Sequence, residues 1–230
     1  MKFDGVESNG DHGLEDEPEY TLIEYAYYLM AVGAGIEMNE CRILAENGRN
    51  HFMTRRFDRD IESGAKIHMQ TLGALAHIDY NTPGLCSYEQ LAHYARELGL
   101  GAKDIEQLYR RMVFNCLAVN QDDHVKNFSF LMDRNGTWSL SPAYDITFAY
   151  DVKNRWLKAH QMTINGKQSD ITAKDLVCAG KTMDIRPSKC KRILEEVKTE
   201  IDKWEMYAEK VGIRERTMDA INTVIKTLVR

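Results

Sequence analysis

The chain has 230 residues, of which 43% are hydrophobic and 28% are charged. This is an ordinary composition for a soluble globular protein, and the length allows one large domain or two small ones. The formal net charge of -5 argues against non-specific nucleic-acid binding, which usually shows as a basic excess. We therefore expect no direct contact with nucleic acid.

No apolar run approaches the roughly 20 residues that span a bilayer, and the first residues lack the hydrophobic stretch of a signal peptide. The cysteines are scattered and form no Cys-x-x-Cys pair: Cys41, Cys86, Cys116, Cys178 and Cys190. This pattern favours reduced thiols over disulfides or metal ligands. We expect a cytoplasmic protein that does not associate with a membrane.

The acidic, glycine-bearing segment 4–18 predicts a mobile loop. A Ca²⁺ site is the alternative, but the spacing of the acids does not match an EF-hand loop. A helix is predicted from Tyr20 to about Ala34, with Glu24 on or near it and glycines at its end. Its apolar face would consist of Leu22, Ala26, Leu29 and Met30.

Residues 41–45 and 51–57 flank the dipeptide Asn47-Gly48, which predicts a β-hairpin. An unpaired edge on this hairpin would expose apolar surface and recruit another chain. Further helices are predicted over 67–78 and 88–98, on either side of a turn. Residues 146–170 look irregular, and three late helices are predicted near 172–180, 188–210 and 214–229.

Between these helical regions lies a helix followed by an acidic loop. Asp104 is a candidate N-terminal cap for this helix, which should end near Asn120. Its apolar positions are Ile105, Leu108, Met112, Cys116 and Leu117. Residues 127–132 and 137–140 then predict two strands joined by a tight turn. The order helix, loop, hairpin and acid places Asp122, Asn127 and Asp145 toward one end of a two-stranded ribbon.

Asp122 and Asn127 have the spacing of a protein-kinase catalytic loop, Asp-x-x-x-x-Asn, and Asp145 follows where such a fold places its metal-binding acid. Phosphoryl transfer needs a base for the attacking hydroxyl and oxygen ligands that hold magnesium on the phosphates. The structural alternative is that Asp122 and Asp123 cap a turn while Asn127 begins a strand. The ordered set favours the functional interpretation.

The motif Asp122-x-His124-x-Lys126-Asn127-Phe128-Ser129, followed by Pro142-x-Tyr144-Asp145-Ile146, resembles the HipA-like serine/threonine kinases, the toxins of bacterial toxin–antitoxin pairs. Further similar stretches are Lys2-Phe3, Arg56-Phe57-Asp58-Arg59 and His160 to Lys167. The resemblance implies an α+β, protein-kinase-like fold. It would have a truncated small lobe in residues 1–58 and a mostly helical large lobe in residues 59–230.

The resemblance also implies roles for the loop residues. Asp122 would accept the proton of the substrate hydroxyl, and Lys126 would reach the transferring phosphate. His124 would orient the loop backbone rather than titrate during catalysis. Asn127 and Asp145 would hold Mg²⁺ between the β- and γ-phosphates of ATP. Asp123 stands where relatives often have a small residue, and we expect it to be exposed and not catalytic.

For the nucleotide, the resemblance implies that Lys2 contacts the α- and β-phosphates and pairs with Glu24. The backbone of Arg55, Arg56 and Phe57 would meet adenine, with the Phe57 ring packed on it. Family analogy suggests a protein substrate such as an aminoacyl-tRNA synthetase, and a small DNA-binding antitoxin as partner.

The sequence departs from the family pattern at its beginning, because no Gly-x-Gly-x-x-Gly loop precedes the Lys2 strand. The expectations compatible with this are a fragment, a natural truncation, a split gene whose partner supplies the small-lobe strands, or a domain without turnover. The competing function is therefore a kinase-derived binding or regulatory module. A metal-dependent phosphohydrolase would use the same acids, but it does not explain the five-residue spacing.

Overall fold

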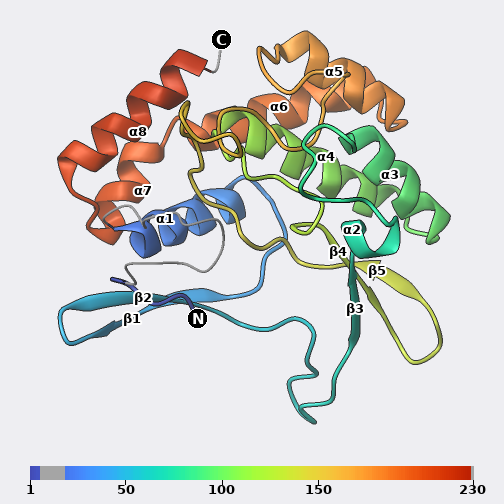
Figure 1. Cartoon of the computed structure of the whole chain (residues 1–230), viewed down its shortest axis with the longest axis horizontal. Helices are drawn as coiled ribbons and strands as arrows, with labels where there is room; N and C mark the ends of the chain where they lie inside the picture. The colour runs from blue at the N-terminus through green and yellow to red at the C-terminus, as the bar shows by residue number, and fades with distance from the viewer. Residues whose placement is uncertain (6–18, 229–230) are drawn as a thin grey trace.

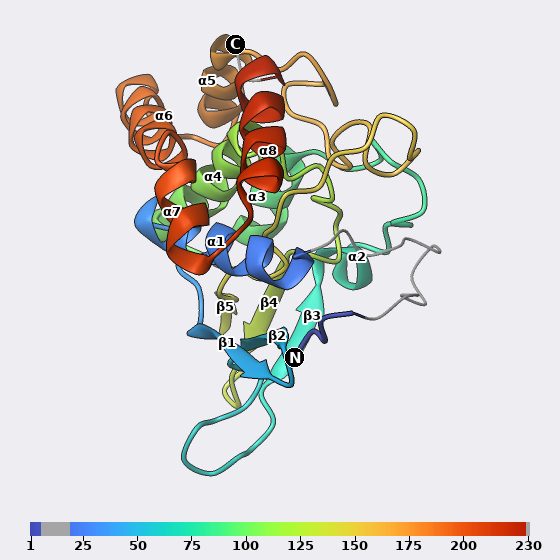
Figure 2. The same ribbon diagram turned by 90° about the vertical axis from the view of Figure 1, so that its left-hand side faces the viewer.

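The computed structural model describes residues 1–5 and 19–228. Most of the predicted acidic loop, and with it the alternative Ca²⁺ site, lies outside the described residues. Helices form the upper layer of the molecule, and two small sheets lie side by side beneath them (Figure 1). The 90° view shows the same division, with α1 (Tyr20–Gly33) between the sheets and the other long helices (Figure 2).

The first sheet is the predicted hairpin. β1 (Cys41–Glu46) and β2 (Arg49–Thr54) are antiparallel, and Cys41 lies opposite Thr54. The turn places both of its residues at positive φ, which explains the dipeptide Asn47-Gly48. Lys2 extends this sheet, because its backbone exchanges two hydrogen bonds with Phe52, at 2.8 and 3.0 Å.

The second sheet has the order β3-β4-β5 and contains β3 (His68–Thr71), β4 (Ser129–Met132) and β5 (Trp138–Leu140). Both pairs are antiparallel, with Gln70 and Leu140 on either side of Phe130. The prediction of a two-stranded ribbon is therefore wrong, because β3 joins β4 and β5 as a third strand. The predicted helix over 67–78 is also wrong, since it comprises β3 and the single turn α2 (Leu72–Leu75). Pairing with β4, more than fifty residues away, overrides the local helical pattern.

The helical layer is built around α4 (Ala102–Leu117), which is buried along most of its second half. α3 (Tyr88–Glu97) packs beside it, and Tyr27 of α1 contacts Phe114 of α4. Both predicted helices are confirmed. The predicted cap of α4 is displaced by one turn. Gly101 is the N-cap, and Asp104 lies in the first turn, where its carboxylate accepts a hydrogen bond of 3.1 Å from Gly101 N.

Four helices complete the chain: α5 (Ala173–Thr182), α6 (Pro187–Ile201), α7 (Trp204–Val211) and α8 (Glu215–Leu228). The single helix predicted over 188–210 is two helices, separated at Asp202 and Lys203. None of the helices in the described part of the chain is long and apolar enough to cross a bilayer. All of the cysteines are unpaired.

Candidate active site

The loop between α4 and β4 is fixed by backbone contacts to a distant segment. Val119 has φ of 56°, which turns the chain sharply after α4. Gln121 N then donates to Ala149 O at 3.0 Å, and Ala149 N donates to Val119 O at 3.1 Å. Asp122 follows immediately and leaves 46% of its side chain exposed. The Asp122 carboxylate is therefore accessible, while hydrogen bonds to Ala149 fix the backbone just before it.

The spacing of five residues is closed by a hydrogen bond. Asn127 Nδ2 donates to the backbone oxygen of Asp122 at 2.8 Å, which leaves the Asn127 Oδ1 atom outside that bond. Tyr144 ties the neighbouring acid to the same loop, because its hydroxyl donates to Lys126 O at 2.6 Å and lies 2.5 Å from Ser129 Oγ. The acid that follows Tyr144 is Asp145.

Lys2 connects α1, through Glu24, with the segment after β5, through Asp145. Its ammonium lies 2.8 Å from Glu24 Oε1 and 2.5 Å from Asp145 Oδ1. It also donates to Tyr20 Oη at 3.2 Å. The structure thus contains the expected Lys2–Glu24 pair and adds a second ion pair with Asp145, whose backbone has φ of 53°.

The charges in this cluster shift one another's ionisation. Burial acts to raise the pKa of Asp145, but the Lys2 ammonium outweighs it and the pKa is lowered. Burial acts to lower the pKa of Lys2, but Glu24 and Asp145 hold it well above its usual value. Burial raises the pKa of Glu24 to about 7 despite Lys2. Asp145 therefore stays ionised at neutral pH.

Asp122 is shifted in the opposite direction. Partial burial of the Asp122 carboxylate raises its pKa, and the charges of Asp145 and Asp123 raise it further, while His124 and Lys2 oppose the shift. The His124 Nε2 atom lies 3.8 Å from Asp122 Oδ1. A carboxylate with a raised pKa is a better proton acceptor, as a general base requires.

Lys126 and His124 share a neighbour that the sequence did not indicate. Lys126 Nζ lies 3.4 Å from the centroid of the Tyr80 ring. The His124 ring packs against the same ring with centroids 6.1 Å apart and an angle of 65° between the planes.

The prediction that Asp123 is exposed is wrong, because only 1% of its surface is accessible. Its carboxylate accepts hydrogen bonds from Tyr88 Oη at 2.7 Å and Gln161 N at 2.7 Å, and it pairs with His160 Nδ1 at 2.9 Å. Burial acts to lower the pKa of His160, but Asp123 outweighs it and raises the pKa to about 10. The network continues from Tyr88 through Asn115 to the start of the loop. Asp123 anchors the loop that carries Asp122.

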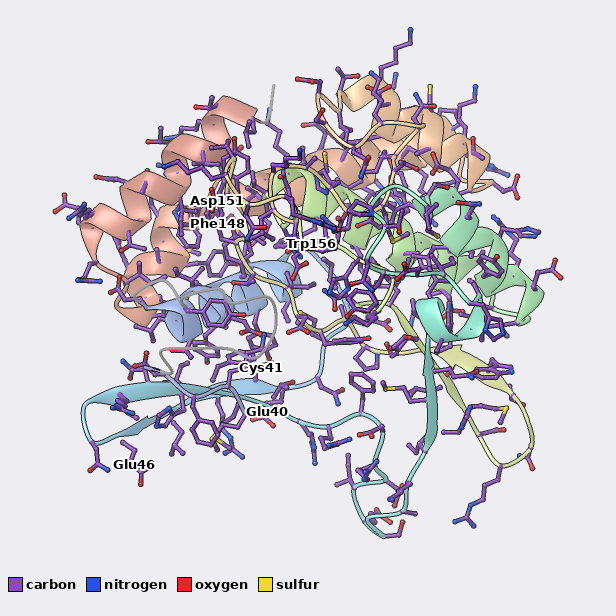
Figure 3. The ribbon with its side chains drawn as sticks, viewed as in Figure 1. Glu40, Cys41, Glu46, Phe148, Asp151 and Trp156 are labelled. Atoms are coloured by element: carbon purple, nitrogen blue, oxygen red, sulfur yellow. The ribbon has the colours of Figure 1, made fainter. Side chains whose placement is uncertain are left out.

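The predicted adenine-binding segment lies at the end of the β1–β2 hairpin where the chain enters from the helical layer, near Glu40 and Cys41 (Figure 3). Arg55 N donates to Glu40 O at 3.0 Å. Phe57 packs against Tyr144, with ring centroids 5.3 Å apart, which places it beside the Asp145 segment. The exposed Arg56 guanidinium instead pairs with Asp58 at 2.5 Å.

The donor atoms fit the magnesium site that the sequence predicts. Asn127 Oδ1 and the ionised Asp145 carboxylate are hard oxygen donors, which Mg²⁺ prefers. In residues 1–5 and 19–228, three or more His, Cys, Asp and Glu side chains nowhere gather as a metal cluster. This is compatible with Mg²⁺, which typically takes one or two protein ligands and completes its shell with water and substrate phosphates.

Residues 1–223 match the family model described as the HipA-like C-terminal domain. A "putative kinase" of Haemophilus influenzae is 29% identical over 161 residues, which are 62% of this chain and 46% of that protein. The "putative kinase Y4mE" of Sinorhizobium fredii is 22% identical over 216 residues, which are 87% of this chain and 44% of that protein. The chain thus spans less than half the length of these curated relatives.

Several solved chains share the fold, and HipA and CtkA are two of them. HipA of Shewanella oneidensis MR-1, determined with HipB and operator DNA, has a TM-score of 0.73 at 18% identity, covering 93% of this chain and 55% of that one. The proinflammatory kinase CtkA of Helicobacter pylori has a TM-score of 0.51 at 13% identity, covering 89% and 88%. The chain belongs to the family of HipA-like C-terminal domains and has a kinase-like α+β fold.

Proposed function

We propose that the chain is an ATP- and Mg²⁺-dependent serine/threonine protein kinase domain of the HipA toxin type. The observation that carries the proposal is that Lys2 forms ion pairs with two segments that are distant from each other in the sequence. Lys2 pairs with Glu24 on α1 and with Asp145 after β5, and Asn127 holds the backbone of Asp122 in the intervening loop. This arrangement supports phosphoryl transfer, which needs a base, oxygen ligands for a metal ion and a cation for the phosphates in one site.

In the proposed reaction, Asp122 takes the proton of the substrate hydroxyl as the oxygen attacks the γ-phosphorus. The bond between that phosphorus and the bridging oxygen to the β-phosphate breaks, which leaves ADP and a phosphorylated side chain. Lys126 would stabilise negative charge on the transferring group, and His124 would orient the loop. Asn127 and Asp145 would hold Mg²⁺, which would supply charge neutralisation on the phosphates.

On the nucleotide side, Lys2 would contact the α- and β-phosphates, with Glu24 keeping its ammonium in place. The segment Arg55–Phe57 would receive adenine; the Phe57 ring beside Tyr144 supports this. We propose the lobe boundary after residue 58, so that the first sheet and α1 form the small-lobe part and residues 59–230 form the large lobe.

The partners follow from the same proposal. The Shewanella HipA structure contains HipB and operator DNA, which supports a small DNA-binding antitoxin as partner. The proposed substrate is a cytoplasmic protein, and an aminoacyl-tRNA synthetase is the suggestion from family analogy. We propose no direct contact of this chain with nucleic acid or with a membrane.

A second candidate is a kinase-derived binding module that a separate small-lobe protein completes. The observation that favours it is the outer edge of β1, which in the described part of the chain pairs with β2 on one side only. Such an edge can accept a strand from another chain. This candidate predicts nucleotide binding and transfer only after the partner has been added.

The test is transfer of label from [γ-³²P]ATP, with Mg²⁺, into the proteins of a bacterial extract, followed by phosphoamino-acid analysis. The proposal expects labelled phosphoserine or phosphothreonine with the wild-type chain and none with Asp122→Ala. Absence of label with the wild type, or equal label with both chains, would overturn it. An Asp219→Ala chain is the matched control, because Asp219 is an exposed acid on α8.

A further inference from the structure

Tyr80 lies in the connection between α2 and α3, more than forty residues before the loop that it contacts. Its ring faces two of the loop's side chains. Lys126 Nζ lies 3.4 Å from the ring centroid, and the His124 ring approaches with centroids 6.1 Å apart. Tyr80 is half-buried, so the ring is supported by the fold on one side.

The Lys126 ammonium has no other compensating group in the described structure. Among residues 1–5 and 19–228, no carboxylate forms an ion pair with it and no oxygen accepts a hydrogen bond from it. Lys2, the other lysine of the site, has carboxylate partners instead. An ammonium seated on an aromatic face keeps its charge available to an incoming anion.

We propose that Tyr80 is a positioning residue for phosphoryl transfer, and that its ring holds the Lys126 ammonium where the transferring phosphate develops charge. The inference rests on the proposed kinase function and adds a residue that the kinase-loop spacing does not include. An ammonium held by a ring, rather than by a carboxylate, does not have to break an ion pair before it acts on the phosphate. The site is therefore preorganised for negative charge.

The expected effect follows from the strength of such a contact. The free energy of a cation–π interaction at a partly desolvated site is large enough that its loss from the transition state lowers the rate of transfer roughly tenfold. Tyr80→Leu should therefore lower kcat roughly tenfold. The KM for ATP should change little, because the proposed nucleotide contacts of Lys2 and Asp145 remain. Tyr80→Phe keeps the ring and should retain wild-type kcat.

A double-mutant cycle separates positioning from a general structural role. If Tyr80 acts through Lys126, then Tyr80→Leu should have no further effect on kcat in a Lys126→Met chain. An additional fall of the same size in that background would overturn the inference. Tyr94→Leu is the matched control, since Tyr94 is a partly buried tyrosine on α3 that pairs with His93.

A second readout needs no activity. In NMR spectra, the ε-methylene protons of Lys126 should be shifted upfield by the Tyr80 ring in the wild type and in Tyr80→Phe, and the shift should be lost in Tyr80→Leu. Absence of the shift in the wild type would overturn the inference. If the wild type transfers phosphate and Tyr80→Leu has the same kcat, the role of Tyr80 is overturned but the proposed kinase function is not. A wild type that transfers no phosphate would overturn the proposed function, and the role of Tyr80 with it.

Discussion

The buried Asp123 carboxylate should contribute strongly to the stability of the loop that carries Asp122. This fully buried carboxylate has three partners: Tyr88 Oη, Gln161 N and His160 Nδ1. Asp123→Ala would remove all three and leave the His160 ring buried without its anion. Breaking a buried, hydrogen-bonded charge pair in this way costs about 3–5 kcal/mol of unfolding free energy.

The pH dependence of this loss has a defined sign. In the wild type, Asp123 raises the pKa of His160 to about 10, whereas an unfolded histidine titrates near 6.5. The stabilisation from His160 is therefore complete below about pH 6.5 and is lost as the pH rises toward about 10. Without Asp123, burial favours the neutral ring, so Asp123→Ala should gain stability as the pH rises through about 6.5. The difference between the two proteins should shrink from acid to alkaline pH.

Urea denaturation of both proteins at pH 6 and at pH 10 measures this difference. Asp219→Ala serves as the control, because Asp219 is exposed, and it should match the wild type at both pH values. A loss below about 1 kcal/mol at pH 6, where a broken buried pair should cost several, would refute the reasoning. A loss that is equal at both pH values would refute the assignment of the charge pair.

The remaining predictions concern metal, packing and the sheet edge. Asp145→Asn should abolish Mg²⁺-dependent ATP binding in isothermal titration while leaving the circular dichroism spectrum unchanged, and equal binding by both chains would remove Asp145 from the site. Gly180→Ala should destabilise the chain by about 1–3 kcal/mol, because the added Cβ would clash with the buried Cys190 Sγ and lie 2.7 Å from Cε2 of the buried Tyr109 ring. Gly101→Ala, whose nearest contact would be at 4.0 Å, is its control, and similar melting curves for the two variants would contradict the packing argument. Size-exclusion chromatography should show association through the free edge of β1, whereas a strict monomer at high concentration would contradict that expectation.

The local parts of the site were predictable from the sequence. The five-residue spacing of Asp122 and Asn127 describes a single turn of chain, and the structure closes it with one hydrogen bond. The β1–β2 hairpin was predicted because Asn47-Gly48 satisfies the positive φ of a tight turn. In both cases the determining interactions lie within a few residues.

The features that were missed depend on distant partners. β3 has a locally helical pattern and becomes a strand only because β4 supplies its hydrogen bonds. Asp123 is next to an exposed acid in sequence, but its burial depends on Tyr88 and His160, each at least 35 residues away. Tyr80 likewise reaches Lys126 only through the fold. No spacing rule within one chain reports contacts of this kind.

The central claim is that Asp122 acts as the base of a phosphoryl-transfer site, and the pH dependence of γ-phosphate transfer tests it most directly. Because burial and the neighbouring acids raise the pKa of Asp122, transfer should decline on the acid side at a higher pH than an ordinary aspartate would give. Asp122→Asn should abolish transfer across the whole range, and Asp219→Asn should follow the wild-type profile. Transfer by Asp122→Asn at the wild-type rate, with an unchanged pH profile, would contradict the account.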